Sequence, residues 1–284
     1  MKPAFGAFAT ASLCIGLLGI SSSAQAAYTF VVDNFNITRG GLGFFNDAFS
    51  DGTPPPSAPN FANGTAASYT VTGTVGPETG GKLTMDSAGG APNPSGFLNN
   101  YQGALLNTNI STLAADSSKG LKSGYAFSVS GLFDLIAPGP VNEAYGIRLT
   151  DKTGTSNGVD TYTLGVRRES DNNLYVDFRQ VNITSITSTT LEKIALNSAH
   201  AQILFMLERP DALSNAIHAS FSYVDGGVVG SATTFSTTPT IFNSVNFTRA
   251  GFDAVTPVPL PAAAWLLGSG LVGLVAIRRK RKAI

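Results

Sequence analysis

The chain has 284 residues, of which 43% are apolar and 10% aromatic, so it can build a buried core, and its composition excludes a disordered chain. Only 13% of the residues are charged, while Gly, Pro, Ser, Thr and Asn are abundant, which favours short strands and turns over helices. The net charge is zero, but the segment from Asp33 to Asp253 holds all 18 acids and 12 of the 18 basic residues, a balance of −6. This argues against a nucleic-acid-binding surface.

The first 26 residues have the three parts of a secretory signal peptide. Lys2 precedes an apolar stretch of about a dozen residues, and the small residues Ala24 and Ala26 flank Gln25. A buried N-terminal helix is the alternative, but no polar face recurs at helical period. We expect cleavage before Ala27. Cys14, the only cysteine, lies in this segment, so the exported protein would have no disulfide and no thiol nucleophile.

Residues 27–256 are predicted to form one all-β body, an antiparallel two-sheet sandwich. The stretch from Gly40 to Asn100 contains TPPPSAPN, NPSG and several glycines, and we expect long irregular loops there. After it, apolar residues alternate with polar ones in four runs, which predict an antiparallel meander: Tyr125–Val129, Tyr145–Leu149, Tyr162–Val166 and Leu174–Phe178.

Two further pairings are expected in the second half of the body. The runs Ile203–Leu207 and Ile217–Tyr223 flank the loop RPDALSN and predict a hairpin. The last run, VNFTRAGFDAV, could pair with the early run YTFVVDNFNIT and so close the sheets. The order AYGIRLTD, DTYTLGVRRE, NLYVDFRQV resembles the concanavalin A-like or laminin G-like jelly roll, and a sandwich of another topology is the alternative.

Catalytic motifs are not recognisable in the body. The two histidines, His200 and His218, are not in a metal-ligand spacing, and the GxSxG elbow, the P-loop and the dinucleotide fingerprint are absent. Glycoside hydrolysis needs two carboxylates. In the glycosidases of the jelly-roll fold that the body resembles, these acids alternate along one strand. The glutamates instead stand singly, as surface or strand-end charges: Glu143, Glu169, Glu192 and Glu208.

Ligand binding by loop residues is the remaining possibility. We expect no cofactor, with calcium as the alternative, because Asp and Asn oxygens in loops bind this ion; the candidates are Asp151, Asp160, Asp171, Asn172 and Asn173. Aromatic side chains near predicted loops could stack on a sugar face or plug the ends of the sandwich; these are Phe44, Phe45, Phe61, Phe97 and Tyr101.

Residues 257–284 predict a membrane anchor. About twenty residues from Val258 to Ile277 carry no charge, which is enough to cross about 30 Å of hydrocarbon. Trp265 suits the outer interface, and Gly268, Gly270 and Gly273 are tolerated in membrane helices. The basic residues that follow would stay on the cytoplasmic side: Arg278, Arg279, Lys280, Arg281 and Lys282. A soluble core helix is the alternative.

This ending resembles the PEP-CTERM sorting signal of exopolysaccharide-producing Gram-negative bacteria. The matching parts are a Pro-x-Pro motif, a Gly-interrupted span and a basic terminus in this order. Leu260 replaces the glutamate of the usual motif, as in the VPLP subgroup formed here by Val258, Pro259, Leu260 and Pro261. The resemblance implies a temporary anchor cleaved by an exosortase-type enzyme.

The sequence therefore predicts an exported, non-enzymatic protein, held at the inner membrane before sorting and then placed on the cell surface or in the extracellular polysaccharide matrix. The expected partners are the sorting enzyme, the membrane and extracellular polysaccharide, with no nucleic acid. A lectin-like carbohydrate-binding module, with or without calcium, is the alternative function, and an extracellular hydrolase is a third.

Overall fold

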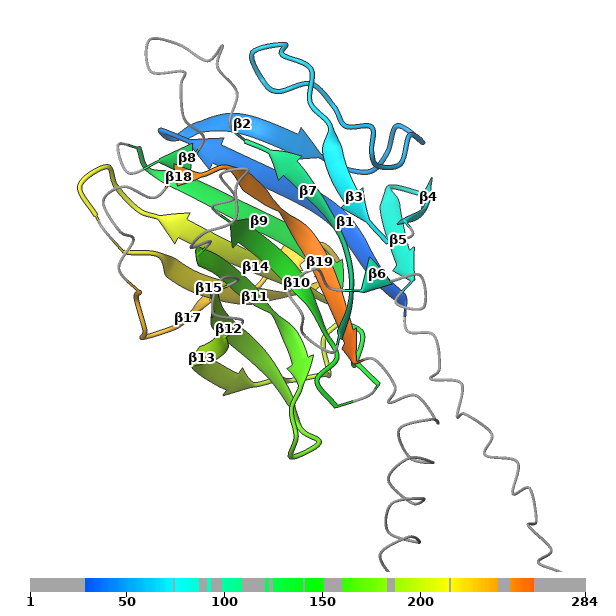
Figure 1. Ribbon diagram of the computed structural model, residues 1–284, viewed down its shortest axis with the longest axis vertical. Helices are drawn as coiled ribbons and strands as arrows, with labels where there is room; N and C mark the ends of the chain where they lie inside the picture. The colour runs from blue at the N-terminus through cyan, green and yellow to red at the C-terminus, as the bar shows by residue number, and fades with distance from the viewer. Residues whose placement is uncertain are drawn as a thin grey trace, which may run out of the picture. The chain divides into compact units, whose positions relative to one another are not determined.

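The computed structural model describes residues 29–73, 75–86, 91–92, 99–108, 121–122, 125–139, 141–150, 160–182, 187–214, 216–239 and 246–257. In these ranges the chain forms strands in two large antiparallel sheets, so the predicted all-β sandwich is confirmed (Figure 1). Among the same residues, no helix is long and apolar enough to cross a membrane. The predicted signal peptide lies outside the described residues, and so does the predicted anchor except for its first residue, Pro257, which ends a strand.

The larger sheet has nine strands. Their bounds are β1 Thr29–Arg39, β2 Leu42–Asp47, β4 Val75–Thr79, β5 Lys82–Asp86, β9 Phe127–Asp134, β14 Gln202–Arg209, β15 His218–Asp225, β16 Val228–Val229 and β17 Thr233–Thr234. The hydrogen-bonded order is β16-β15-β14-β9-β1-β5-β4, with β2 beside β1 and β17 beside β15. The first strand of the body thus lies in the middle of this sheet.

The smaller sheet has eight strands. Their bounds are β3 Tyr69–Thr72, β6 Ala91–Pro92, β7 Asn99–Asn107, β10 Ala144–Thr150, β11 Asp160–Arg168, β12 Leu174–Asn182, β13 Thr187–Ala195 and β19 Arg249–Pro257. Its order is β13-β12-β11-β10-β19-β7-β3, with β6 beside β7. A separate pair joins β8 Leu121–Lys122 to β18 Asn246–Phe247.

Alternating side chains explain why these segments form strands around one core. Along β9 and β14 buried and half-buried residues alternate without exception, because successive side chains of a strand point to opposite faces. The strand β10 differs, since six of its seven residues are buried. Its outward face is therefore covered as well, which matters for the site described below.

Aromatic rings from both sheets fill the space between them. Tyr145 of β10 lies 5.7 Å from Phe133 of β9 and 5.9 Å from Phe30 of β1, measured between ring centroids. The Tyr145 hydroxyl accepts a hydrogen bond from the Ile136 amide at 3.0 Å and donates one to the Asp134 carbonyl at 3.3 Å. The tyrosine therefore fixes the chain that leaves the larger sheet.

The predicted meander is confirmed for three of its four runs. The strands β10, β11 and β12 are consecutive antiparallel neighbours, and β13 extends them. The run Tyr125–Val129 does not belong to this meander, because its strand β9 lies in the other sheet between β1 and β14. The predicted hairpin is also confirmed, as β14 pairs with β15.

The predicted pairing of the last run with the first is wrong. The strand β19 pairs with β10 and β7, whereas β1 pairs with β2, β5 and β9. The two strands meet face to face instead, with the rings of Phe35 and Phe252 5.6 Å apart. Each strand needs a partner for its apolar face, and each finds it across the core.

The stretch from Gly40 to Asn100 is more regular than expected. It contains β2 to β6 and the start of β7, while residues 48–68 form no strand. These strands were missed because they are short and interrupted by turns at which glycine adopts positive φ, among them Gly73 (80°) and Gly81 (76°).

Candidate functional site

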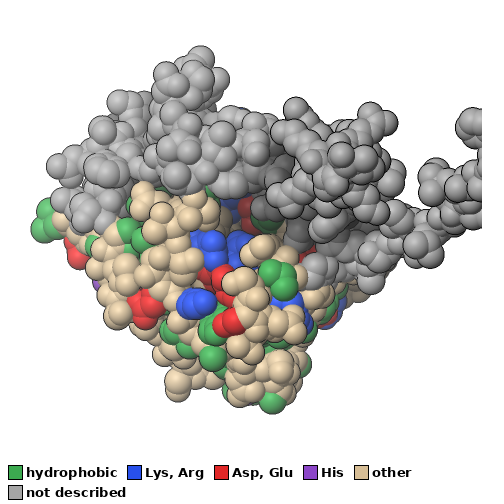
Figure 2. Space-filling model, turned by 60° about the horizontal axis from the view of Figure 1, so that its bottom comes forward, with side chains coloured by type: hydrophobic (Ala, Val, Ile, Leu, Met, Phe, Trp, Pro, Cys, Tyr) green, Lys and Arg blue, Asp and Glu red, His purple; other side chains and the backbone are tan. Residues whose placement is uncertain are grey.

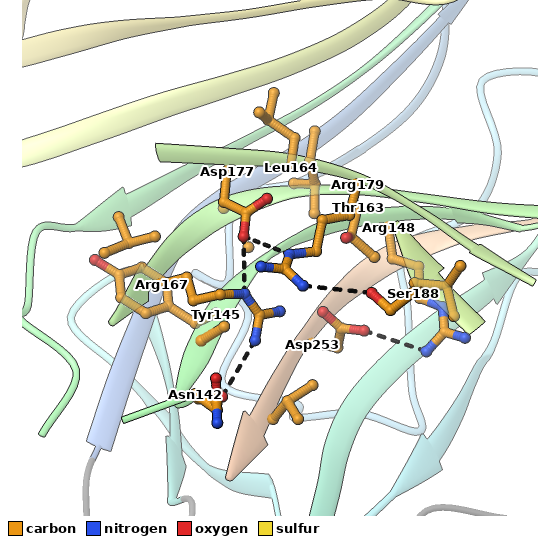
Figure 3. Close-up of a pocket in the computed structure, with 17 residues that line it drawn as sticks. Asn142, Tyr145, Arg148, Thr163, Leu164, Arg167, Asp177, Arg179, Ser188 and Asp253 are labelled. Atoms are coloured by element: carbon orange, nitrogen blue, oxygen red, sulfur yellow. Dashed lines mark hydrogen bonds and ion pairs between the residues drawn. The ribbon is translucent and has the colours of Figure 1, made fainter. Parts of the chain in front are cut away.

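A pocket of about 210 Å³ opens on the outer face of the smaller sheet, away from the core (Figure 3). It lies over β10, β11, β12 and β19, and its polar lining is formed chiefly by Arg148, Arg167, Asp177, Arg179 and Asp253. Figure 2 shows basic and acidic side chains side by side on one face of the molecule. The outer face of this sheet, which would ordinarily be a solvated surface, therefore carries a pocket lined by charged side chains.

The register of four strands brings the pocket residues together. Gly146 of β10 lies opposite Asp253 of β19 on one side and opposite Gly165 of β11 on the other, and Gly165 lies opposite Asp177 of β12. Directly opposed residues share a face, so these four form one row across the sheet. The row has a carboxylate at each end and two glycines between them.

The two glycines form a floor without side chains. A Cβ atom on Gly146 would lie 2.2 Å from the carbonyl oxygen of Leu164, and one on Gly165 would lie 2.0 Å from that of Tyr145. Real Cβ atoms do not approach backbone oxygens so closely, so only glycine fits at either position. Between the two carboxylates, β10 and β11 therefore add no side chain of their own to the pocket.

The neighbouring rows supply the arginines. Arg148 of β10 lies opposite Thr163 of β11, which lies opposite Arg179 of β12. Arg167 of β11 belongs to the row on the other side of the glycines, opposite Ala144 and Tyr175. Each arginine thus stands next to an aspartate of the central row.

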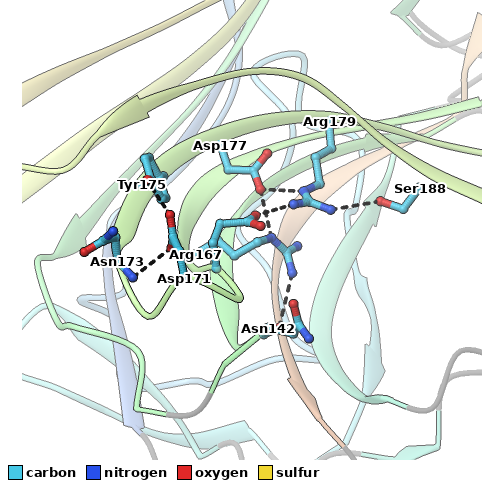
Figure 4. A network of polar contacts seen from close by, with 9 residues as sticks. Asn142, Arg167, Asp171, Asn173, Tyr175, Asp177, Arg179 and Ser188 are labelled. Atoms are coloured by element: carbon cyan, nitrogen blue, oxygen red, sulfur yellow. Dashed lines mark hydrogen bonds and ion pairs between the residues drawn. The ribbon is translucent and has the colours of Figure 1, made fainter.

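Asp177 is shared between two arginines (Figure 4). Its Oδ2 atom accepts a hydrogen bond from Nε of Arg167 at 2.9 Å and another from Nε of Arg179. Arg167 also donates from Nη1 to the carbonyl of Asn142 at 3.2 Å, and Nη2 of Arg179 contacts Glu169. The guanidinium planes are therefore held in place before any ligand arrives.

The second aspartate has its own arginine. Nη1 of Arg148 lies 3.2 Å from Oδ2 of Asp253, whose side chain is buried. Burial raises the pKa of Asp253, and the charge of Arg148 opposes that shift. This pair closes the pocket on the β19 side.

A buried carboxylate oxygen of the pocket residue Asp177 lacks a hydrogen-bond partner among the described residues. Asp177 is 3% exposed, yet its Oδ1 atom has no hydrogen-bond partner in the described structure. Burial raises the pKa of this carboxyl, whereas the charges of Arg179 and Arg167 act against the shift. A buried acceptor without a donor costs about 1–3 kcal/mol. A ligand with a suitably placed donor would recover that free energy.

The predicted sorting and anchor residues lie outside the described residues, so the structure places none of them. These are Ala24, Ala26, Val258, Pro259, Leu260, Pro261, Trp265, Gly268, Gly270, Gly273, Arg278, Arg279, Lys280, Arg281 and Lys282.

Three of the aromatic residues considered for sugar stacking are buried. Phe44, Phe45 and Phe61 are at most 5% exposed and contact one another, with the Phe61 centroid 5.2 Å from Phe44 and 5.6 Å from Phe45. The stacking role is therefore wrong for these three, which plug the sandwich. Tyr101 lies in β7 rather than a loop, and Phe97 is outside the described residues.

The calcium candidates are not gathered into a site in the described structure. Both carboxylate oxygens of Asp171 are used in the turn, by the Asn173 amide at 2.9 Å and the Tyr175 hydroxyl at 2.7 Å. Asn172 accepts from Arg168, Asp160 is the first residue of β11, and Asp151 lies outside the described residues. Among the residues described, no group of three or more acidic, His or Cys side chains could hold a metal.

His200, Glu169 and Glu192 have structural partners. Nδ1 of His200 lies 2.6 Å from Asp225, and the ring stacks on Tyr223 at 4.1 Å. His218 lies opposite Glu208 in the β14–β15 hairpin. Glu143 lies at a strand end, directly before β10, but it is not on the surface: it is 1% exposed, and burial raises its pKa to about 7.

A repeated spacing was the signal for the pocket that sequence reasoning missed. Glycine precedes a charged residue by two positions in three strands, at Gly146 and Arg148, at Gly165 and Arg167, and at Gly251 and Asp253. Residues two apart in a strand share a face, so each pair places a bare backbone next to a charge. The spacing alone does not say that the three strands are neighbours.

Comparison with known proteins gives no family for this chain. No family model matches it, and no curated protein matches it. Among solved structures, it is similar to a protein of unknown function from Shewanella oneidensis MR-1, with a TM-score of 0.28 and 13% identity over 89% of each chain. That similarity is too low to support an argument about function.

Proposed function

We propose that the protein is an exported, non-enzymatic sandwich that binds a glycan through the pocket over Gly146 and Gly165. The observation that carries the binding role is that Asp177, a buried residue of the pocket lining, has an Oδ1 atom without a donor in the described structure. Sugar hydroxyls are donors as well as acceptors, and they would meet this oxygen and the surrounding guanidinium groups together. The glycine floor would let the apolar face of a sugar ring lie against the backbone.

The export part of the proposal rests on the two ends of the chain. The signal-like start and the VPLP ending with its span and basic tail support export, temporary anchoring in the inner membrane and sorting by an exosortase-type enzyme. The destination would be the cell surface or the extracellular polysaccharide matrix. A jelly-roll topology of the concanavalin A-like kind is the finer fold that we propose for the two sheets.

The charges of the pocket favour binding over catalysis. Asp177 and Asp253 are separated by three strand spacings, which puts their Cα atoms about 14 Å apart. Each carboxylate is also bound by arginine, through Oδ2 in both cases. A glycosidase needs one carboxylic acid and one carboxylate about 5–10 Å apart across the bond.

A pocket-filling substitution tests the binding role. Thr163 projects into the pocket from β11, so Thr163→Phe should fill it without removing any ion pair. Thr70 of β3 belongs to the same cross-strand row, four strands away, and is exposed. Thr70→Phe is therefore a matched control.

The measurement is binding to an array of bacterial and plant glycans, followed by calorimetry on any glycan that binds. We expect Thr163→Phe to weaken binding at least about tenfold, while Thr70→Phe retains it. An array without any bound glycan, or equal binding by both variants, would overturn the binding role. Hydrolysis of a bound glycan by the purified protein would instead make it an enzyme.

The export proposal has its own test. The intact mass of the protein recovered from the surface or medium of its native host should lack the first 26 or so residues and everything beyond about Pro261. A mass that retains the basic tail would mean a permanent anchor. A mass that retains both ends would contradict the export signals.

A further inference from the structure

The lining of the pocket is rich in arginine. It includes Arg148, Arg167 and Arg179 together with two acids, Asp177 and Asp253. Arg179 is also paired with Glu169 outside the lining, so three basic and three acidic side chains meet around the pocket. A guanidinium group with a donor to spare can still bind an anionic group directly.

Arg167 has hydrogen-bond donors left over. Its hydrogen bonds use Nε, which reaches Asp177, and Nη1, which reaches the carbonyl of Asn142. Within the described part of the chain, its Nη2 group has no partner. Guanidinium donors form their strongest hydrogen bonds with a carboxylate or phosphate.

The unused donor and the unused acceptor lie on adjoining side chains. Nε of Arg167 is 2.9 Å from Oδ2 of Asp177. The donor Nη2 of Arg167 and the acceptor Oδ1 of Asp177 therefore belong to two side chains that are already hydrogen-bonded to each other. A simple anion would suit Arg167 but would meet the like charge of Asp177. A neutral sugar would satisfy Asp177 and leave Arg167 without a negative partner.

We propose that the pocket takes an acidic sugar, a pyranose with a carboxylate beside a hydroxyl, as in a uronic acid. The carboxylate accepts from Nη2 of Arg167, and the neighbouring hydroxyl donates to Oδ1 of Asp177. The ring lies in the pocket beside Gly146 and Gly165, which add no side chain of their own. This inference rests on the proposed glycan-binding function and names the class of sugar.

The test compares each acid with its own methyl ester. Trisaccharides of galacturonate, glucuronate and mannuronate are titrated into the purified protein by calorimetry, each as the free acid and as the ester. The ester keeps the ring and the hydroxyls and removes the charge. We expect at least one acid to bind about tenfold or more tightly than its ester, with the ratio falling as salt rises.

Arg167→Lys checks the assigned donor. The lysine keeps the positive charge but cannot hold Asp177 and a ligand carboxylate with one planar group, so the preference for the acid should shrink. Lys193→Ala removes a positive charge from the same face of the sheet outside the pocket lining and should leave the preference intact. Retained binding of the ester by Arg167→Lys shows that the pocket is still folded.

The outcomes separate this inference from the function on which it rests. Equal binding of acid and ester, or tighter binding of the ester, overturns the acidic-sugar assignment and leaves glycan binding in place. The same conclusion follows if only neutral glycans bind. Binding of no acid, ester or neutral glycan overturns both proposals.

Discussion

Phe35 and Phe252 contact each other edge to face across the core, with ring centroids 5.6 Å apart and both side chains fully buried. Phe35 lies in the first strand of the body and Phe252 in the last. Phe252 also contacts Phe49 and Tyr69 at 5.6 and 5.8 Å. Rings from three other segments therefore meet around Phe252.

Truncating Phe252 should be among the most damaging changes in the core. Removing a fully buried phenylalanine costs about 3–5 kcal/mol, because the transfer free energy of the ring is lost and a cavity remains. The free energy of unfolding of Phe252→Ala from urea denaturation measures this loss. Leu213→Ala is the control, since Leu213 is 91% exposed and should change stability by less than about 0.5 kcal/mol.

Gly165→Ala should destabilise the smaller sheet. The new methyl group would lie 2.0 Å from the carbonyl oxygen of Tyr145, so β10 and β11 must move apart, at a cost of about 1–3 kcal/mol. Thermal unfolding checks the effect. Gly43→Ala, at a position with nothing within 4 Å of the added atom, should be tolerated. Equal melting temperatures for the two variants would contradict the tight contact.

Glu143→Gln should flatten the dependence of stability on pH. Burial raises the pKa of Glu143 from 4.5 to about 7, so the folded state holds its proton more tightly than the unfolded state. Stability from this group is present below pH 4.5 and falls as pH rises through 7, by up to about 3 kcal/mol. Burial raises the pKa of Glu78 to about 7 as well, so the single substitution removes only part of the slope.

Urea midpoints at pH 5 and pH 8 measure that slope. Glu192→Gln is the contrasting control. Burial opposes the shift at Glu192, but hydrogen bonds from Thr237 and Ser236 outweigh it and lower the pKa of this carboxyl. Its replacement should therefore not flatten the slope. A slope unchanged in Glu143→Gln would mean that this carboxyl is ionised in the folded protein at pH 5.

Tyr145→Phe should cost about 1–2 kcal/mol, although the ring and its packing are kept. The lost hydroxyl leaves the Ile136 amide and the Asp134 carbonyl without this partner. Amide hydrogen exchange at Ile136 should quicken in the variant. Unchanged exchange there would show that another group protects the amide.

Alternation along the chain was enough to predict the longer strands after residue 124, because every second residue of such a strand faces the core. The short strands β2 to β6 do not show it clearly and were missed. It could not say which sheet a strand joins. The runs that hold Val129 and Ile147 look alike, yet they belong to opposite sheets. Membership is decided by contacts between distant segments, and a local pattern carries no information about them.

The pocket was missed for a related reason. Arg148 and Asp177 occupy positions of their strands that ordinarily face water, so the sequence pattern predicts a solvated charge at each. Whether they line a site depends on the register of the strands, which places two glycines between the aspartates and leaves room for a cavity. Phe44 and Phe61, which the sequence offered either for sugar stacking or for closing the sandwich, are buried and take the second role.

The position of β19 has a mechanical consequence. The strand is held along its length by β10 on one side and by β7 on the other, up to the pairing of Pro257 with Asn99. The hydrogen bonds of both ladders run across the strand direction. A pull on Pro257 along the strand would therefore load many bonds in shear at once, whereas an edge strand can be peeled away one bond at a time.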